Sequence, residues 1–164
     1  MPNIDASLSL EVNIQHQTLT LLKYAKPWLC YRVSTALNGA GEMSSSGCTP
    51  RGHHIVRAKI GQQKPINSVF VARRPTGEIY SGTLAKQYPN RDWILSRILW
   101  LSGTQPGVNR LGAVDTMRRY IYIHGTPDTE PMGVPLSHGC IRMKNLDIVD
   151  LFDRVSVGAR VIIV

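Results

Sequence analysis

The chain has 164 residues, of which 43% are hydrophobic and 18% are charged. This length and composition exclude a disordered chain and suit one globular domain spanning residues 1–164. The net charge of +8 permits nucleic acid, an anionic membrane surface or an acidic small molecule as a partner. The basic residues are scattered, however, and no nucleic-acid motif with interleaved aromatic residues is present. We therefore expect a monomeric protein with no nucleic-acid partner.

The amino-terminal region lacks the pattern of an export signal. Its first lysine is Lys23, and apolar and polar residues alternate from Leu8 to Ile14, whereas a secretory signal has a basic segment followed by a continuous apolar one. No run of the chain approaches the roughly 18 apolar residues of a membrane span. If Met1 is the native start, we expect a cytoplasmic protein; if a leader has been removed, the alternative is a periplasmic one.

Short stretches of alternating or continuous apolar residues, separated by Gly- and Pro-containing turns, predict a series of strands. The predicted strands are Leu8–Ile14, Thr18–Leu22, Trp28–Ala36, His54–Lys59, Ser68–Arg73 and Val161–Val164. The first two form a hairpin. The segment Trp93–Leu101 fits either a strand or a short helix, and its β-branched and aromatic residues favour the strand. Tyr80–Arg91 fits no single pattern.

Only one helix is convincing. Asn145 is predicted to cap it, Asp147 lies in its first turn, and Gly158 ends the connection that follows. Its predicted apolar face consists of Leu146, Val149, Leu151, Phe152 and Val155. Asp115 is predicted to cap a single turn through Arg119, although a contact with His124 is the alternative. These patterns predict a mainly β domain of sandwich or barrel type with one or two short helices.

The glycine- and serine-rich segment Asn38–Gly47 predicts a flexible loop, which either gates a site or is an ordinary surface loop. Two of the three cysteines, Cys30 and Cys48, fit reduced thiols better than a disulfide in a domain of this size. Cys48, His53 and His54 lack the second cysteine of a familiar zinc spacing. We expect no metal and no cofactor.

Cys140 has the sequence neighbours that a thiol nucleophile needs. A thiol with an ordinary pKa of about 8.5 is mostly protonated near neutrality, so an imidazole must accept its proton. His138 shares a face with Cys140 if the segment is extended, and His124 ends an apolar run that predicts a neighbouring strand. Gly139 permits a sharp turn, so that nearby amides can face an oxyanion. Arg142 adds a positive charge that lowers the thiol pKa, binds a substrate carboxylate or holds the loop.

The segment Ser137-His138-Gly139-Cys140-Ile141-Arg142-Met143, preceded by the pair His124-Gly125, resembles the signature of the L,D-transpeptidase catalytic domain, also called the YkuD domain. Thr49-Pro50-Arg51-Gly52 is similar to an upstream element of that family, and the likeness covers Ser9–Val164. The resemblance implies the L,D-transpeptidase catalytic fold. It also implies that Cys140 is the nucleophile, that His124 accepts its proton, and that the carbonyl of Gly125 orients the imidazole. Backbone groups of His138, Gly139 and Cys140 would surround the oxyanion, and Ser137 and Arg142 would contact the substrate.

Members of that family attack the bond after the third residue of a murein tetrapeptide, release the terminal D-alanine and form an acyl-cysteine. The resemblance therefore implies a murein or peptidoglycan stem peptide as partner and carbapenems as inhibitors. A cytoplasmic location favours an L,D-carboxypeptidase in peptidoglycan recycling. The alternative is a periplasmic L,D-transpeptidase that forms cross-links or exchanges D-amino acids. Two other classes stay open, namely a metal hydrolase using His124, His138 and Cys140, and a non-catalytic binding module.

Overall fold

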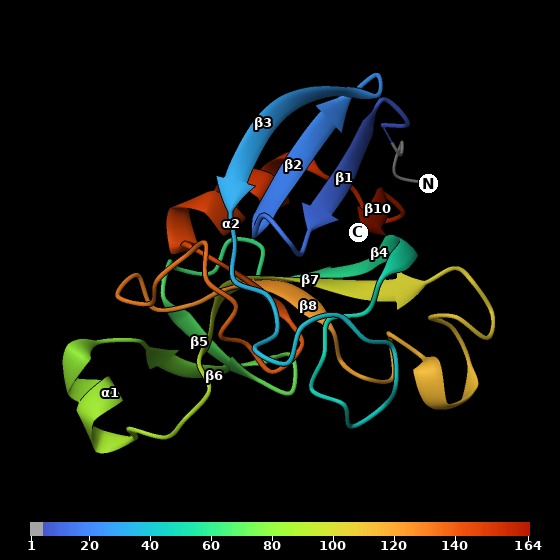
Figure 1. The fold of residues 1–164 in the computed structure, drawn as a ribbon. Coiled ribbons are helices and arrows are strands. Elements are labelled where there is room, and N and C mark those ends of the chain that lie inside the picture. The colour runs from blue at the N-terminus through green and yellow to red at the C-terminus, as the bar shows by residue number, and fades with distance from the viewer. Residues whose placement is uncertain (1–4) are drawn as a thin grey trace.

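The computed structural model describes residues 5–164, which form ten strands, two α-helices and one 3-10 turn (Figure 1). The strands are β1 (Leu8–Asn13), β2 (Thr18–Lys23), β3 (Lys26–Arg32), β4 (Gly52–Ile60), β5 (Ser68–Val71), β6 (Arg74–Ile79), β7 (Ile94–Gly103), β8 (Tyr122–Gly125), β9 (Ile141–Met143) and β10 (Arg160–Ile163). The helices are α1 (Gly82–Gln87) and α2 (Asn145–Arg154), and the 3-10 turn covers Gly112–Val114. The predicted mainly β fold is confirmed.

The strands belong to one mixed sheet with the order β3-β2-β1-β10-β4-β7-β5-β6. The last strand of the chain, β10, lies between β1, to which it is parallel, and β4, to which it is antiparallel. A side branch leaves the sheet at β7, where β8 pairs antiparallel with β7 and β9 pairs parallel with β8. In Figure 1, β1, β2 and β3 lie at one end of the molecule, and β5, β6 and α1 lie at the other.

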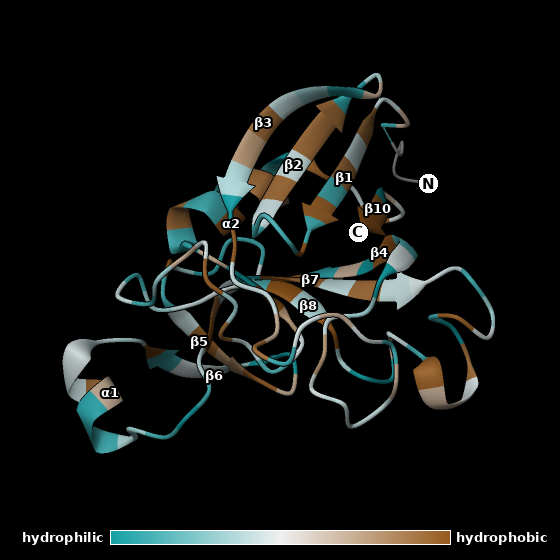
Figure 2. Cartoon of the chain, viewed as in Figure 1, coloured by the Kyte–Doolittle hydropathy of each residue, from teal (hydrophilic) through white to brown (hydrophobic). Residues whose placement is uncertain are grey.

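The main core lies where the sheet curves around α2. Strands β1 and β2 alternate buried and half-buried residues, so their apolar side chains face one way, as the banded colouring in Figure 2 shows. The buried residues Leu10, Leu21, Leu101 and Ile123 join Phe152 of α2 in this core. Tyr31 of β3 also donates a 2.6 Å hydrogen bond to Asp150 of α2. The helix is thus held against both halves of the sheet.

The predicted third strand is shorter than expected. β3 ends at Arg32, and the residues beyond it make isolated bridges, Ser34 with Arg142 and Ala36 with Ser137. This extended segment therefore supports the Cys140 region instead of prolonging the sheet. Trp93–Leu101 is a strand, as favoured, and the ambiguous Tyr80–Arg91 contains α1, which Ser81 caps through its hydroxyl.

The prediction for α2 was correct in position and wrong in two details. Lys144 occupies the N-cap position without a side-chain cap, and Asn145 is the first helical residue and is fully buried. Asn145 accepts a hydrogen bond from Ser96 and donates to the Thr126 carbonyl, so its polar groups are satisfied inside the protein. Leu146, predicted to lie on the apolar face, is 73% exposed, while Ile148 lies in the core.

Asp115 caps the turn after the 3-10 segment, as predicted, because its carboxylate accepts from the amides of Leu111 and Arg118. The three cysteines are free thiols. Among residues 5–164, neither helix has the length and apolar character needed to cross a bilayer.

Candidate active site

The pairing of β8 with β9 brings the predicted nucleophile and base to one region of the sheet. Ile123 pairs with Ile141, and His124 pairs with Arg142. Because side chains alternate along a strand, Ile123 and Ile141 face the core while His124 shares the opposite face with the Cys140 region. The paired residues are eighteen positions apart in the sequence and become neighbours because β9 runs parallel to β8.

The thiol of Cys140 is enclosed by backbone groups. Its Sγ accepts a hydrogen bond from the Tyr122 amide at 3.3 Å and donates to the Tyr120 carbonyl at 3.4 Å. Burial raises the pKa of Cys140 to about 12, and the Asp92 carboxylate adds to the rise. The Tyr122 amide, Arg142 and Arg119 act in the opposite direction without overcoming burial. The resting side chain is therefore a protonated thiol.

The imidazole of His124 is only 1% exposed. Its Nδ1 lies 2.6 Å from the Gly125 carbonyl oxygen, which can only accept, so Nδ1 carries the proton and Nε2 is left as a base. Burial lowers the pKa of His124, which keeps the ring neutral. A side chain at Gly125 would collide with the Leu95 carbonyl, 2.4 Å from the position of its Cβ. Glycine is thus needed where this carbonyl turns back to the imidazole.

The loop carrying Cys140 is bent, not extended. Ser137 is buried; its hydroxyl donates to the Cys140 carbonyl at 2.5 Å and accepts from the Gly139 amide at 3.2 Å. Gly139 has a φ of +134°, and a Cβ there would lie 3.2 Å from the Cys48 carbonyl oxygen. Ser137 therefore shapes the loop that carries Cys140.

Thr49 connects the upstream Thr-Pro-Arg-Gly element to this loop. Its hydroxyl donates to the Gly139 carbonyl at 2.9 Å and accepts from the Ala36 amide at 3.0 Å. Nearby, Arg119 donates to the Cys48 carbonyl at 2.6 Å. The motif is visible in the sequence, but this contact of Thr49 could not be predicted because its partner, Gly139, is ninety residues away.

His138 does not share a face with Cys140, because the chain bends between them. Its side chain is 79% exposed, and Nδ1 lies 3.6 Å from one oxygen of Asp92. Arg142 donates to the other oxygen of Asp92 at 3.0 Å and to the Leu136 carbonyl at 3.4 Å. Arg142 is thus engaged in holding the loop. Asp92 was missed, and nothing in its local sequence marks it.

His138 lines two cavities. One, of about 150 Å³, lies beside Asp92, Thr126, Glu130 and Arg142; the other, of about 450 Å³, lies beside Ser44, Gly47, Arg119 and Tyr120. The second cavity borders the predicted glycine- and serine-rich loop. Among residues 5–164, no group of three or more His, Cys, Asp or Glu side chains is arranged to hold a metal ion.

Comparisons with known proteins agree with this geometry. A short segment is 49% identical over 43 residues to the probable L,D-transpeptidase YbiS of Escherichia coli K12, covering 26% of this chain and 14% of that protein. Another is 47% identical over 51 residues to the putative L,D-transpeptidase YqjB of Bacillus subtilis 168, covering 31% and 29% respectively. The chain thus matches less than a third of the length of these curated relatives.

Solved structures share the fold over nearly the whole chain. An L,D-transpeptidase from Mycobacterium smegmatis superposes with a TM-score of 0.61 at 19% identity, covering 97% of this chain and 59% of that one. L,D-transpeptidase LdtMt1, solved in complex with imipenem, gives 0.57 at 19% identity, covering 96% and 59%. The model of the family described as "YkuD: L,D-transpeptidase catalytic domain" matches residues 8–163. The chain therefore belongs to the YkuD family of L,D-transpeptidase catalytic domains.

Proposed function

We propose that the protein is a cysteine acyl-transfer enzyme that cleaves the bond after the third residue of murein tetrapeptides, acting as an L,D-carboxypeptidase. The observation that carries this proposal is the placement, at the paired strands β8 and β9, of a thiol bonded to the Tyr122 amide and a buried imidazole whose Nδ1 is fixed by a backbone carbonyl. This arrangement leaves Nε2 of His124 as the acceptor for the Cys140 proton. Membership of the YkuD family supports murein stem peptides as the substrate class.

In the proposed reaction, Nε2 of His124 takes the proton of Cys140 as Sγ attacks the substrate carbonyl. Deprotonation accompanies attack, because burial disfavours a free thiolate at rest. The Gly139 amide is already bonded to Ser137, so the Cys140 and His138 amides are the proposed donors to the oxyanion. The imidazolium then protonates the leaving amine, D-alanine departs, and an acyl-cysteine remains. Water adds to this thioester, releasing the tripeptide and restoring the thiol.

A second candidate is L,D-transpeptidation, and the presence of two cavities lined by His138 favours it. Acyl transfer to an amine needs one space for the acyl donor and another for the acceptor, whereas hydrolysis needs only the donor space and water. The two functions share every step up to the acyl-cysteine. They differ only in whether water or an amine attacks the acyl-cysteine.

The test is an incubation of the protein with a soluble murein tetrapeptide, with and without an added D-amino acid, followed by mass spectrometry. Tripeptide and free D-alanine, in amounts unaffected by the D-amino acid, are expected for the carboxypeptidase. Exchanged tetrapeptide or cross-linked dimer would instead establish the transpeptidase. Absence of all three products would contradict both functions.

Two matched variants test whether Cys140 is the nucleophile. Cys140→Ala is expected to abolish product formation and to remain folded, while Cys30→Ala, at an exposed cysteine, is expected to behave as the wild type. Imipenem should acylate the wild-type protein once, through opening of the β-lactam ring by Sγ. An adduct that persisted in Cys140→Ala would contradict the assigned nucleophile.

A further inference from the structure

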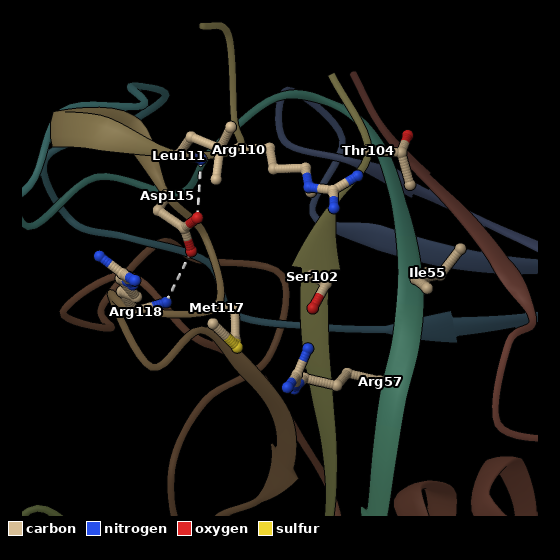
Figure 3. A pocket seen from close by; sticks show the side chains of 10 residues that line it. Ile55, Arg57, Ser102, Thr104, Arg110, Leu111, Asp115, Met117 and Arg118 are labelled. Carbon is tan, nitrogen blue, oxygen red and sulfur yellow. Dashed lines mark hydrogen bonds between the residues drawn. The ribbon is translucent and has the colours of Figure 1, made fainter. Parts of the chain in front are cut away.

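A third cavity, of about 240 Å³, lies at the carboxyl-terminal end of β7, away from the Cys140 loop (Figure 3). Strand β4 supplies Ile55 and Arg57, β7 supplies Ser102, and the segment around the 3-10 turn supplies Arg110, Asp115 and Arg118. None of these residues contacts Cys140 or His124. The reaction proposed above therefore does not use this cavity.

The charge of this cavity is strongly unbalanced. Within residues 5–164, the guanidinium groups of Arg57, Arg110 and Arg118 make no salt bridge and no hydrogen bond. Arg57 has only a stacking contact, 5.5 Å from the centre of the Trp100 ring. The one acid of the wall, Asp115, has its two oxygens bonded to the amides of Leu111 and Arg118 at 2.7 and 2.9 Å. Three positive charges thus surround one negative charge.

Ser102 gives an independent indication of a ligand. Its hydroxyl oxygen is buried and has no hydrogen-bond partner within residues 5–164, a condition shared there only with the Nε of Arg97. A buried hydroxyl without a partner is unfavourable. Figure 3 shows the Ser102 side chain directed into the cavity, between Arg57 and Arg110. Solvated surface arginines alone would not explain an unpaired hydroxyl among them.

We propose that this cavity is a binding site for an oxyanion, namely a carboxylate or phosphate group of a ligand. The Ser102 hydroxyl would donate one hydrogen bond, and the guanidinium groups of Arg57 and Arg110 would donate the others, since their planar donor pairs match both oxyanions. Arg118, on the opposite wall beside Asp115, adds positive charge at the mouth. Arg118 also borders the larger cavity next to His138.

The test is a titration of the full chain with inorganic phosphate and, separately, with acetate, at constant ionic strength, followed by amide chemical shifts in NMR spectra. Saturable shifts are expected at Ser102, Gly103 and Leu111. The tighter of the two probes identifies the chemistry: phosphate for a phosphate-bearing ligand, acetate for a carboxylate. Shifts that grow linearly without saturation for both probes would overturn the proposal.

Three variants make the test specific. Arg57→Gln and Arg110→Gln are each expected to weaken binding about tenfold, because each removes a charged donor pair. Arg160→Gln removes the same charge from an exposed position on β10, outside the cavity, and is expected to leave binding unchanged. Equal weakening in all three would mean that only net charge matters and would overturn the proposal. Thermal unfolding of each variant verifies that it is folded.

Discussion

At the residue scale, the dominant influence on Cys140 is the loss of solvent around its sulfur. Arg142 and Arg119 both favour a thiolate, yet burial raises the pKa to about 12. One reason is that Arg142 is paired with Asp92, whose carboxylate itself opposes ionisation of the thiol. The thiol is therefore protonated in the free protein, and the proposed reaction requires its proton to pass to His124 when substrate is bound.

This environment predicts a slow reaction of Cys140 with iodoacetamide in the free protein. A pKa of about 12 leaves on the order of one thiol in 10⁵ ionised at pH 7, compared with a few per cent for an ordinary thiol. Because the pKa is raised, the rate should grow about tenfold per pH unit from pH 7 to pH 10 without levelling off. Alkylation of each cysteine-containing peptide, followed by mass spectrometry, measures this rate.

Exposed Cys30 is the internal control, since its peptide reports reagent quality and should be alkylated before that of Cys140. Circular dichroism at each pH verifies that the fold persists. A rate for Cys140 that levelled off below pH 9 would mean that the positive charges outweigh burial.

The sequence was sufficient to predict Cys140 as nucleophile, His124 as base and the Gly125 carbonyl as its partner, because their order and spacing resemble a family signature. It was not sufficient for the protonation state of the thiol, which depends on Asp92, about fifty residues away in the sequence. The prediction that the charge of Arg142 lowers the thiol pKa is correct in direction. It omitted the larger opposing effect of burial, which only the fold determines.

At the scale of elements, the hairpin of β5 and β6 has a two-residue turn that contains neither glycine nor asparagine. Both of its central residues have positive φ, +47° at Ala72 and +64° at Arg73, as a type I′ turn requires. This turn directs Arg73 over the rings of Trp100 and Tyr120, 4.4 and 4.9 Å from their centres, and lets it donate to the Tyr122 hydroxyl at 2.9 Å. The hairpin thus packs against the residues that enclose the Cys140 sulfur.

Ala72→Asn is expected to stabilise the protein by about 0.5–1 kcal/mol, because asparagine tolerates positive φ better than alanine does. Ala72 is exposed, so the new side chain meets no packed neighbour. Urea unfolding measures the change in free energy. Ala113→Asn is the control, since Ala113 is also exposed and is not among the residues with positive φ. A gain of the same size in both variants would exclude the turn as the cause.

Elements with a clear apolar period, such as β1 and β2, could be located from the sequence, whereas β7 was favoured as a strand only by its β-branched and aromatic residues. One missed element, β6 (Arg74–Ile79), consists almost entirely of exposed residues, so it carries no alternation to detect. The N-cap of α2 was misassigned for a related reason. Asparagine is a common N-cap residue, but the side-chain amide of Asn145 accepts a hydrogen bond from Ser96 and donates one to the Thr126 carbonyl. Tertiary hydrogen bonds decided its position.

At the scale of the whole molecule, β10 joins two parts of the sheet. Strands β1, β2 and β3 connect to the remainder of the sheet through the pairing of β10 with β1 on one side and β4 on the other. Ile163 of β10 is buried in the main core, while its neighbour Ile162 faces the other side and is partly exposed. The last residues of the chain are therefore central to the fold, although they lie far in sequence from both partners.

Ile163→Ala is expected to lower the free energy of unfolding by about 2–5 kcal/mol, the range for removing a large aliphatic side chain from a packed core. Ile162→Ala, which deletes the same atoms one position away, should cost clearly less because Ile162 already contacts solvent. Urea unfolding should give one transition that coincides for tryptophan fluorescence and far-ultraviolet circular dichroism, since the core around α2 takes residues from both sides of β10. Two separate transitions would mean that β1–β3 unfold independently, and equal losses in the two variants would contradict the role assigned to the inward face of β10.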